Sequence, residues 1–399
     1  MLALSLILTT PGLHAAALPS VEPMPTLDAA TLAPAGLLNG SGYTVDGNVP
    51  VVGYMGQFTL RAPAGTFSAN GTEMLAIRVG ELAQIAQLSQ LSQTGVFADA
   101  LAASAMKTGA AIGQAVMNPV ETISGIPAGI GRFFQSASTT IARASESTNA
   151  NSQQPGGAAM DLLGLNTAKR RIAKQVGADP YTTNPVLAKQ LNDLGQAAFT
   201  GGVSLDVALA VSTAGVATAI SATAKVSSLV WDKSPEDIRS INEQLLAAMG
   251  VGADTVRAFV TNRWLPPTLS VPLVDSLAQM PAARGRAAVV ALASTVASEG
   301  EARFILNAVS MARQVSTERD PVVALDLTGR ILMVRTRGGR TAVPAPVDYV
   351  VWTEPVMAFA TRNKSKGARR DILVTGVASA RAREGLQATG WDVREHSQR

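Results

Sequence analysis

The side chains that most often carry out chemistry in enzymes are scarce in this chain. It has no cysteine and two histidines, His14 and His396. Without cysteine there is no disulfide, no thiol nucleophile and no thiolate metal site. A Ser-His-Asp triad needs an oriented imidazole, and a catalytic zinc usually needs several. Because His14 falls in a segment that we expect to be removed, the mature chain is not expected to form either site.

Carboxylates are the remaining candidates for acid-base chemistry or metal binding. Asp326, Asp348 and Glu354 occur within one segment, but the sequence does not fix their separation. A glycosidase, for example, needs two carboxylates about 5 to 9 Å apart. We therefore assign no catalytic residue, no metal ligand and no cofactor. An enzyme is the weaker interpretation of this chain.

Four residues near the C-terminus have the types and the order of an anion site. Thr375 and Gly376 follow an expected strand, and Ser379 and Arg381 begin an expected helix. Ligands of open α/β sheets gather where strands end and helices begin, because free N–H groups point there. A hydroxyl and a guanidinium beside them would suit an anionic group. The alternative is that Ser379 only caps the helix and Arg381 faces water.

Residues 207–224 form an uncharged run between Asp206 and Lys225. A helix over this run would be about 27 Å long, close to the ~30 Å hydrocarbon thickness of a bilayer. Its small residues recur at helical spacing, which lets helices pack closely; these residues are Ala210, Ala214, Gly215 and Ala219. We expect a buried central helix. The alternative is a helix that inserts into a membrane and packs along the same four residues.

The first residues are typical of an export signal. Residues 1–17 contain an apolar run, then Pro11 and Gly12, then the small-x-small pattern Ala15-Ala16-Ala17. This pattern predicts cleavage before Leu18 and an exported protein, periplasmic or secreted. The basic residues that usually precede the apolar run are missing. Either the true start lies upstream, or the run is the first helix of a cytosolic protein.

The secondary structure expected from the sequence differs from one segment of the chain to the next. Residues 18–36 are rich in Pro and Ala and predict an extended linker. Residues 37–134 predict a β-plus-helix region, with short antiparallel strands between Asn-Gly and Asp-Gly turns. We expect residues 73–79 to be its last strand and the helices to start at Gly80. Residues 135–157 are poor in apolar side chains and predict a disordered linker.

The second half of the chain predicts a helical domain over residues 158–318 and an α/β unit over residues 319–399. Ser234-Pro235-Glu236-Asp237 is a helix start with a capping serine, and Ser298-Glu299-Gly300-Glu301 is a capping box. In the last unit a hairpin is followed by alternating strands and helices, which predicts a short parallel sheet. The fold class expected from the whole chain is α+β and predominantly helical.

The positive charge of the chain is concentrated in its last segment. The formal net charge is +4, and residues 320–399 carry 13 basic and 8 acidic side chains, a net charge of +5. A nucleic-acid partner would require a denser basic stripe and stacking aromatics. We therefore expect an envelope protein or an anionic ligand as partner. Peripheral or integral membrane contact stays open, and so does the oligomeric state.

Three segments together resemble a group of exported bacterial proteins with no assigned activity. They are GQFTLRAPAGTFSANGTEMLAIRV, ADPYTTNP and DILVTGVASARAREGLQATGWDV, which start at Gly56, Ala178 and Asp371. The resemblance implies export and no catalytic residue. The sequence thus predicts a non-catalytic exported binding or scaffold protein of the bacterial envelope. The alternatives are a membrane-inserting or pore-type protein that uses residues 207–224, and an enzyme that uses carboxylates of the C-terminal unit.

Overall fold

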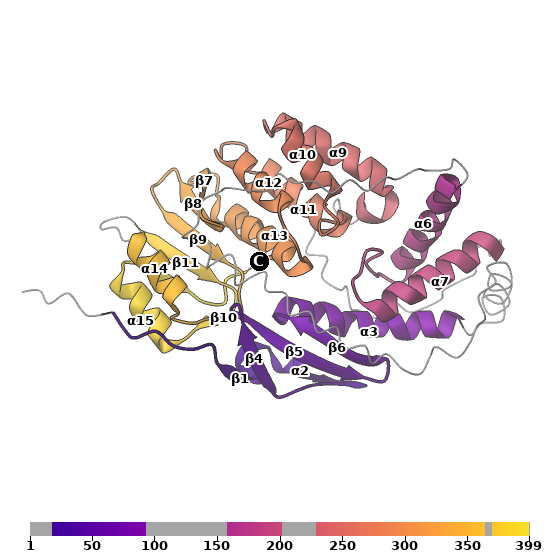
Figure 1. The fold of residues 1–399 in the computed structure, drawn as a ribbon, viewed down its shortest axis with the longest axis horizontal. Coiled ribbons are helices and arrows are strands. Elements are labelled where there is room, and N and C mark those ends of the chain that lie inside the picture. Colours follow the sequence, from indigo (N-terminus) through magenta and orange to yellow (C-terminus); the bar gives the residue numbers. More distant parts are fainter. Residues whose placement is uncertain (1–17, 93–157, 202–228, 364–368, 399) are drawn as a thin grey trace, which may run out of the picture.

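The computed structural model describes residues 18–92, 158–201, 229–363 and 369–398 (Figure 1). Three sequence predictions fall outside the described residues: the signal peptide 1–17, the linker 135–157 and the apolar run 207–224. The four helix-packing candidates Ala210, Ala214, Gly215 and Ala219 belong to that run. Among the described residues, no helix combines the length and the apolar character needed to cross a bilayer.

An antiparallel sheet is built from the N-terminal strands. Its order is β1-β4-β5-β3-β2, and β6 pairs with the other edge of β5. The strands are β1 (Thr26–Asp28), β2 (Asn39–Gly40), β3 (Tyr43–Val45), β4 (Asn48–Val52), β5 (Met55–Ala62) and β6 (Gly65–Asn70). Two short helices, α1 (Ala29–Leu32) and α2 (Ala35–Leu38), connect β1 to β2. The segment expected to be an extended linker therefore contains a strand and the beginning of the helical connection.

Three long helices form the N-terminal core together with this sheet; the first packs on the sheet, the third on the first, and the second on the third. They are α3 (Thr72–Ser92), α6 (Ala158–Gln175) and α7 (Pro185–Gly201). Leu60 of β5, Leu75 and Leu88 of α3, Ile172 of α6 and Leu191 of α7 are all fully buried there. Burying a side chain of this size stabilises the fold by about 1.5–3 kcal/mol. Residues 73–79, expected to be a strand, instead form the first turns of α3.

Five further helices follow α7 in the described residues and precede the C-terminal strands. They are α9 (Pro235–Ala248), α10 (Ala253–Thr261), α11 (Pro267–Ala278), α12 (Arg286–Ser294) and α13 (Glu299–Val315). Ser234 caps α9 with both bonds of a capping box, and the Ser298 hydroxyl accepts from the Glu301 amide at the start of α13. These caps confirm the predicted helix starts, because a serine oxygen satisfies an N–H that has no partner within the helix.

A mixed sheet forms the C-terminal part, in the order β13-β11-β9-β8-β7. Its strands are β7 (Val322–Thr328), β8 (Ile331–Thr336), β9 (Thr341–Ala345), β11 (Arg370–Val374) and β13 (Asp392–Arg394). β9, β11 and β13 are parallel, whereas β7, β8 and β9 are antiparallel. β10 (Tyr349–Val350) and β12 (Val377–Ala378) form a separate parallel pair.

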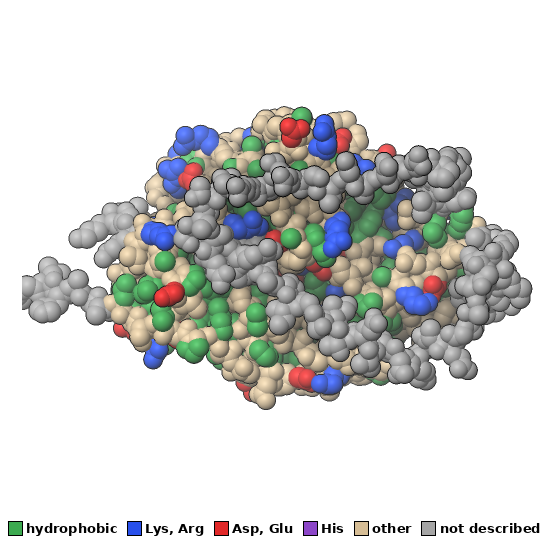
Figure 2. Space-filling model, viewed as in Figure 1, with side chains coloured by type: hydrophobic (Ala, Val, Ile, Leu, Met, Phe, Trp, Pro, Cys, Tyr) green, Lys and Arg blue, Asp and Glu red, His purple; other side chains and the backbone are tan. Residues whose placement is uncertain are grey.

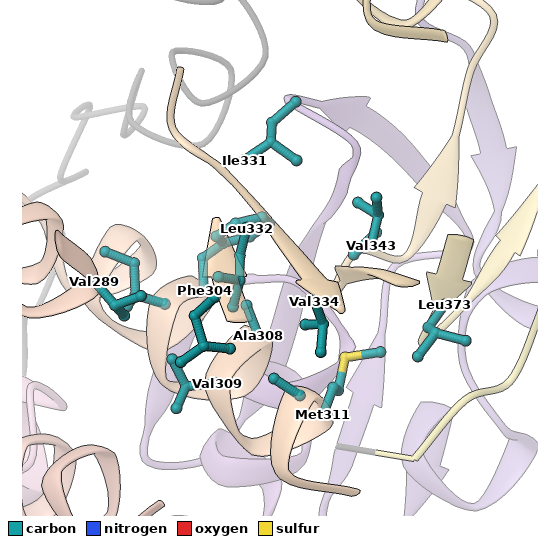
Figure 3. Close-up of a cluster of buried hydrophobic side chains, with 14 of the residues drawn as sticks. Val289, Phe304, Ala308, Val309, Met311, Ile331, Leu332, Val334, Val343 and Leu373 are labelled. Atoms are coloured by element: carbon teal, nitrogen blue, oxygen red, sulfur yellow. The ribbon is translucent and has the colours of Figure 1, made fainter. Parts of the chain in front are cut away.

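Helices cover both faces of the C-terminal sheet. α13 lies on one face, and α14 (Glu354–Arg362) and α15 (Ala380–Ala388) lie on the other (Figure 1). Phe304 and Met311 of α13 approach Leu332 and Val334 of β8 (Figure 3). With α9–α12 these residues form the C-terminal core, which Tyr54 of the β4–β5 turn and Met55 of β5 also enter.

The expectation of a predominantly helical fold is wrong. Of the residues that the structure describes, about 50% are in helices and 21% in strands, so the fold is mixed α/β. Several strands span only two or three residues, and strands so short give no clear alternation in sequence. The C-terminal sheet is also not purely parallel, because the β7–β8 hairpin joins it along β9.

Candidate functional site: a charged junction between two cores

α3 carries charged side chains on a face that is buried. Arg78 and Glu81 are 8% and 3% exposed, and they lie three residues apart on one side of the helix. An ionised side chain is costly to bury unless it is paired and hydrogen-bonded. The surroundings of these two residues must therefore supply partners.

Glu81 receives hydrogen bonds at both carboxylate oxygens. Arg78 Nη1 lies 2.7 Å from Oε2, and Asn184 Nδ2 lies 2.9 Å from the same oxygen. The Thr182 hydroxyl donates to Oε1. Two of these donors come from a segment about a hundred residues away, between α6 and α7. Glu81 therefore fixes that segment against α3.

The segment between α6 and α7 is organised around its own polar side chains. Asn184 is fully buried, and its Oδ1 accepts from the Val186 and Leu187 amides at 3.0 and 3.3 Å, which caps α7. The Asp179 carboxylate accepts from the Tyr181 amide at 2.8 Å. The Trp231 indole donates to the Ala178 carbonyl at 3.0 Å. The segment that carried part of the sequence resemblance thus contacts several helices.

α13, which belongs to the C-terminal core, contacts the same polar side chains. Its Arg303 lies 2.9 Å from Glu299 and 3.4 Å from Glu73 of α3. Asn307 of α13 also donates to Glu73. The Thr183 hydroxyl accepts from Arg78 at 2.6 Å and donates to Glu299 at 2.6 Å.

These contacts link the two cores through one polar network, which we call the junction cluster. Its members are Glu73, Arg78, Glu81, Asp179, Thr182, Thr183, Asn184, Glu299, Arg303 and Asn307. Basic and acidic side chains are seen together between α13 and α3, near the centre of the view in Figure 2.

The junction cluster holds four carboxylates and two guanidiniums. The pKa values of two of its carboxyls, Asp179 and Glu299, shift in opposite directions. Burial raises the pKa of Asp179 to about 6, against the opposing effects of the Tyr181 amide and the charge of Arg303. Burial also disfavours ionised Glu299, but Arg303 and the Thr183 hydroxyl outweigh it and lower the pKa of that carboxyl. The pKa of Arg303 is raised because Glu299 and Glu73 overcome its burial. Asp179 is thus the cluster carboxyl for which a pKa near neutral pH is shown.

Asp348 forms a second link between the two ends of the chain. It is 2% exposed, and its carboxylate accepts from the Gly56 amide at 2.9 Å and the Thr72 amide at 3.1 Å. A carboxylate at the first turn of α3 is favoured by the helix dipole. The Tyr54 carbonyl accepts from the Asp348 amide at 3.1 Å.

The structure places the three carboxylates that the sequence offered for catalysis in three different surroundings. Asp348 lies against α3. Asp326 lies on β7 in an exposed pair with Arg335, at 2.7 Å. Glu354 lies in the first turn of α14. The elements that hold them are different, and the first two have protein partners.

The four predicted anion-site residues follow one another from the end of β11 to the first turn of α15, with β12 between them. The Thr375 hydroxyl donates to the Val347 carbonyl at 2.9 Å, and the Ser379 hydroxyl accepts from the Ala382 amide at 3.0 Å. A Cβ on Gly376 would lie 1.9 Å from the Asp348 carbonyl oxygen, so only glycine fits there. The Arg381 side chain is 51% exposed, with its Nε 4.0 Å from a carboxylate oxygen of Glu22.

Carboxylates of the chain itself lie beside these residues. Glu395 accepts from the Ala378 amide at 2.8 Å and from Arg383 at 2.8 Å. Glu22 lies near Arg381. These carboxylates provide the negative charge that was expected from a ligand. Binding of an external anion at Thr375, Gly376, Ser379 and Arg381 stays a prediction.

A small apolar cavity lies inside the C-terminal core. Its volume is about 30 Å³, and Tyr54, Phe304, Val343, Phe359 and Leu386 are among its lining residues. A space of this size holds about one water molecule. It is a packing defect rather than a pocket for a substrate.

The junction cluster was missed in the sequence because its contacts are remote and because α3 starts earlier than expected. Glu73 and Arg78 fall in residues 73–79, which were expected to be a strand. A signal was nevertheless present, since both segments that meet here belong to the three that carry the resemblance. The described residues contain no group of three or more His, Asp or Glu side chains arranged to hold a metal ion.

Comparisons with protein family models, with curated proteins and with solved structures find no match to this chain.

Proposed function

We propose that this chain is an exported, non-catalytic binding or scaffold protein of the bacterial envelope. Its partner would be an envelope protein or an anionic ligand. One observation carries the non-catalytic part: the carboxylates of the junction cluster are bound by the chain itself. Glu81 accepts from Arg78, Thr182 and Asn184. A polar network whose members satisfy each other stabilises one arrangement of the surrounding elements.

The other glutamates of the junction cluster support the same proposal. Glu299 accepts from Arg303 at 2.9 Å and from Thr183 at 2.6 Å. Glu73 accepts from Arg303 and from Asn307. A catalytic carboxylate must reach a proton or an electrophile of its substrate. These carboxylates instead reach across the boundary between the two cores.

The residues that follow the predicted cleavage site are compatible with export. The Trp352 indole donates to the Pro19 carbonyl at 2.9 Å, and the Glu22 amide donates to the Trp352 carbonyl at 2.9 Å. Trp352 is fully buried. A chain that begins at Leu18 would therefore keep its first residues bound to the C-terminal part. This arrangement is compatible with removal of residues 1–17.

An acid-base enzyme is a second candidate, and one observation favours it. The pKa of Asp179 is raised to about 6 while the pKa of Glu299 is lowered. Pairs of carboxyls with diverging pKa values are typical of enzymes in which one group donates and the other accepts a proton. Replacing Asp179 by Asn separates the candidates. A binding protein keeps its ligand affinity, whereas an enzyme loses its turnover.

Fractionation of bacteria that express the full chain tests the proposed function. We expect the protein in the periplasm or the medium, beginning at Leu18, and released from membranes by alkaline carbonate. Cytosolic protein with an intact Met1 would contradict export. Retention in the carbonate pellet that disappears when residues 207–224 are deleted would instead support the membrane-inserting alternative.

A further inference from the structure

Three arginines surround one buried carboxylate at the start of β11. Asp371 is fully buried, and Arg340 Nε lies 2.6 Å from its Oδ2. Arg369 Nε lies 3.3 Å from the same oxygen, and Arg394 Nε lies 3.3 Å from Oδ1. They come from three places: Arg340 just before β9, Arg369 just before β11, and Arg394 at the end of β13. We call Arg340, Arg369 and Arg394 the arginine cluster.

The arginine cluster carries more positive charge than Asp371 neutralises. One carboxylate balances one guanidinium, and Arg340 makes the shortest contact with it. Two further carboxylates lie nearby, the exposed Asp392 and the half-buried Asp320. Asp392 is opposite Asp371 in the strand register, and Asp320 accepts from the Gly338 amide at 2.6 Å. Asp320 also interacts with Arg340 and Arg337, so four arginines and three carboxylates leave one positive charge on this part of the sheet.

The donor groups of the arginine cluster are arranged for a further acceptor. All three guanidiniums direct Nε at Asp371, and the side chains of Arg369 and Arg394 are 59% and 52% exposed. Among the described residues, the Nη groups of these arginines have no hydrogen-bond partner. A guanidinium presents its N–H donors in a planar fork that matches phosphate and carboxylate oxygens.

We propose that the arginine cluster binds a phosphate group through the Nη donors of Arg369 and Arg394. Asp371 positions the guanidiniums, so their side chains lose less freedom when the ligand binds. This inference deepens the proposed binding function and rests on it, since it names the chemistry of the anionic ligand. The phosphate group can belong to a free anion or to a lipid headgroup, because the arginine cluster lies on the surface.

Titration of the purified full chain with inorganic phosphate at low ionic strength tests the site. Calorimetry is run on the wild type, on Arg369→Gln and on Arg394→Gln. Arg257→Gln is the matched control, because Arg257 is 76% exposed and lies 3.8 Å from Asp254 in another part of the fold. Arg381→Gln tests whether the anion binds at the start of α15 instead. Vesicles with and without phosphatidylglycerol identify a lipid source.

We expect saturable phosphate binding that weakens as salt is added. Arg369→Gln and Arg394→Gln should each weaken it about tenfold or more, because each removes charged hydrogen bonds. Arg257→Gln and Arg381→Gln should bind as the wild type does. Binding only to phosphatidylglycerol vesicles, lost in the same two variants, also supports the site and identifies a headgroup.

Three outcomes would overturn the inference. The wild type binds neither phosphate nor phosphatidylglycerol vesicles, Arg369→Gln and Arg394→Gln bind as well as the wild type, or Arg381→Gln alone removes binding. Since these titrations use purified protein, they do not depend on where the cell places it. A cytosolic protein that binds phosphate at this site would refute export and leave the site standing.

Discussion

Replacing Asp179 by Asn should make the protein more stable at neutral pH. In the folded chain burial raises the pKa of this carboxyl from its ordinary value of 3.8 to about 6. The folded state therefore binds the proton more tightly than the unfolded state does. It follows that the free energy of unfolding falls as the pH rises from 4 to 6. Above this range the folded state bears the full cost of burying the ionised carboxylate.

The magnitude follows from the size of the pKa change. A rise of the pKa from 3.8 to about 6 corresponds to about 3 kcal/mol. Since Asp179 is partly exposed to water, we expect about 1–3 kcal/mol. An Asn side chain has no charge to bury, and its Oδ1 can still accept from the Tyr181 amide, now 2.8 Å from the carboxylate. The variant should thus match the wild type at pH 4 and exceed it by this amount at pH 8.

Urea unfolding followed by tryptophan fluorescence, at several values between pH 4 and pH 8, measures this difference. Titration of the other carboxyls is common to both proteins, so the difference between the two curves isolates Asp179. Asp254→Asn is the control, because the Asp254 side chain is 99% exposed. If Asp179→Asn is less stable than the wild type at pH 8, or if the difference does not change with pH, the explanation by burial is wrong.

Two further substitutions probe the contacts between the two cores. Glu81→Ala leaves Arg78 buried without its carboxylate, so thermal or urea unfolding should show a loss of stability of about 3–5 kcal/mol. Glu243→Ala, at an exposed position, is the control. An equal effect of both substitutions would contradict a stabilising role of the junction cluster. Gly376→Ala places a Cβ 1.9 Å from the Asp348 carbonyl oxygen, so we expect a loss of about 1–3 kcal/mol. Gly36→Ala meets no atom within 4 Å and should change little; a neutral Gly376→Ala would show that the backbone there can move.

Elements with strong local signals could be predicted from the sequence. Ser234 and Ser298 mark the starts of α9 and α13 because a serine oxygen at these positions accepts from the helix's own first turn. The helix expected to begin at Ser379 corresponds to α15, which Ser379 caps. Such signals are local, and a single sequence contains all of the residues involved within one turn.

Elements that depend on distant partners could not be predicted in this way. β9 was missed because Thr341–Ala345 contains Pro344 and little alternation, yet its pairing with β8 and β11 makes it the centre of the C-terminal sheet. The start of α3 was assigned to a strand, since residues 73–79 include β-favouring types as well as helix-favouring ones. Pairing and packing decide such segments.

The junction cluster likewise could not be predicted from the sequence. Glu81 contacts Asn184, and Glu73 contacts Arg303, across about 100 and 230 residues of sequence. No spacing rule relates residues so far apart. The anion-site residues, in contrast, were predicted to lie together because they follow one another in the chain. Their position was accessible from sequence, but the neighbouring carboxylates Glu22 and Glu395 were not.

Native-state hydrogen exchange tests most directly the claim that the junction cluster joins the two cores into one unit. We expect slow amides of β5 in the N-terminal core and β9 in the C-terminal core to open with the same free energy in the wild type. In Glu81→Ala the two should separate, because the network between them is broken. If β5 and β9 already open with different free energies in the wild type, and Glu81→Ala does not change their difference, the junction cluster does not couple the cores and its structural role is refuted.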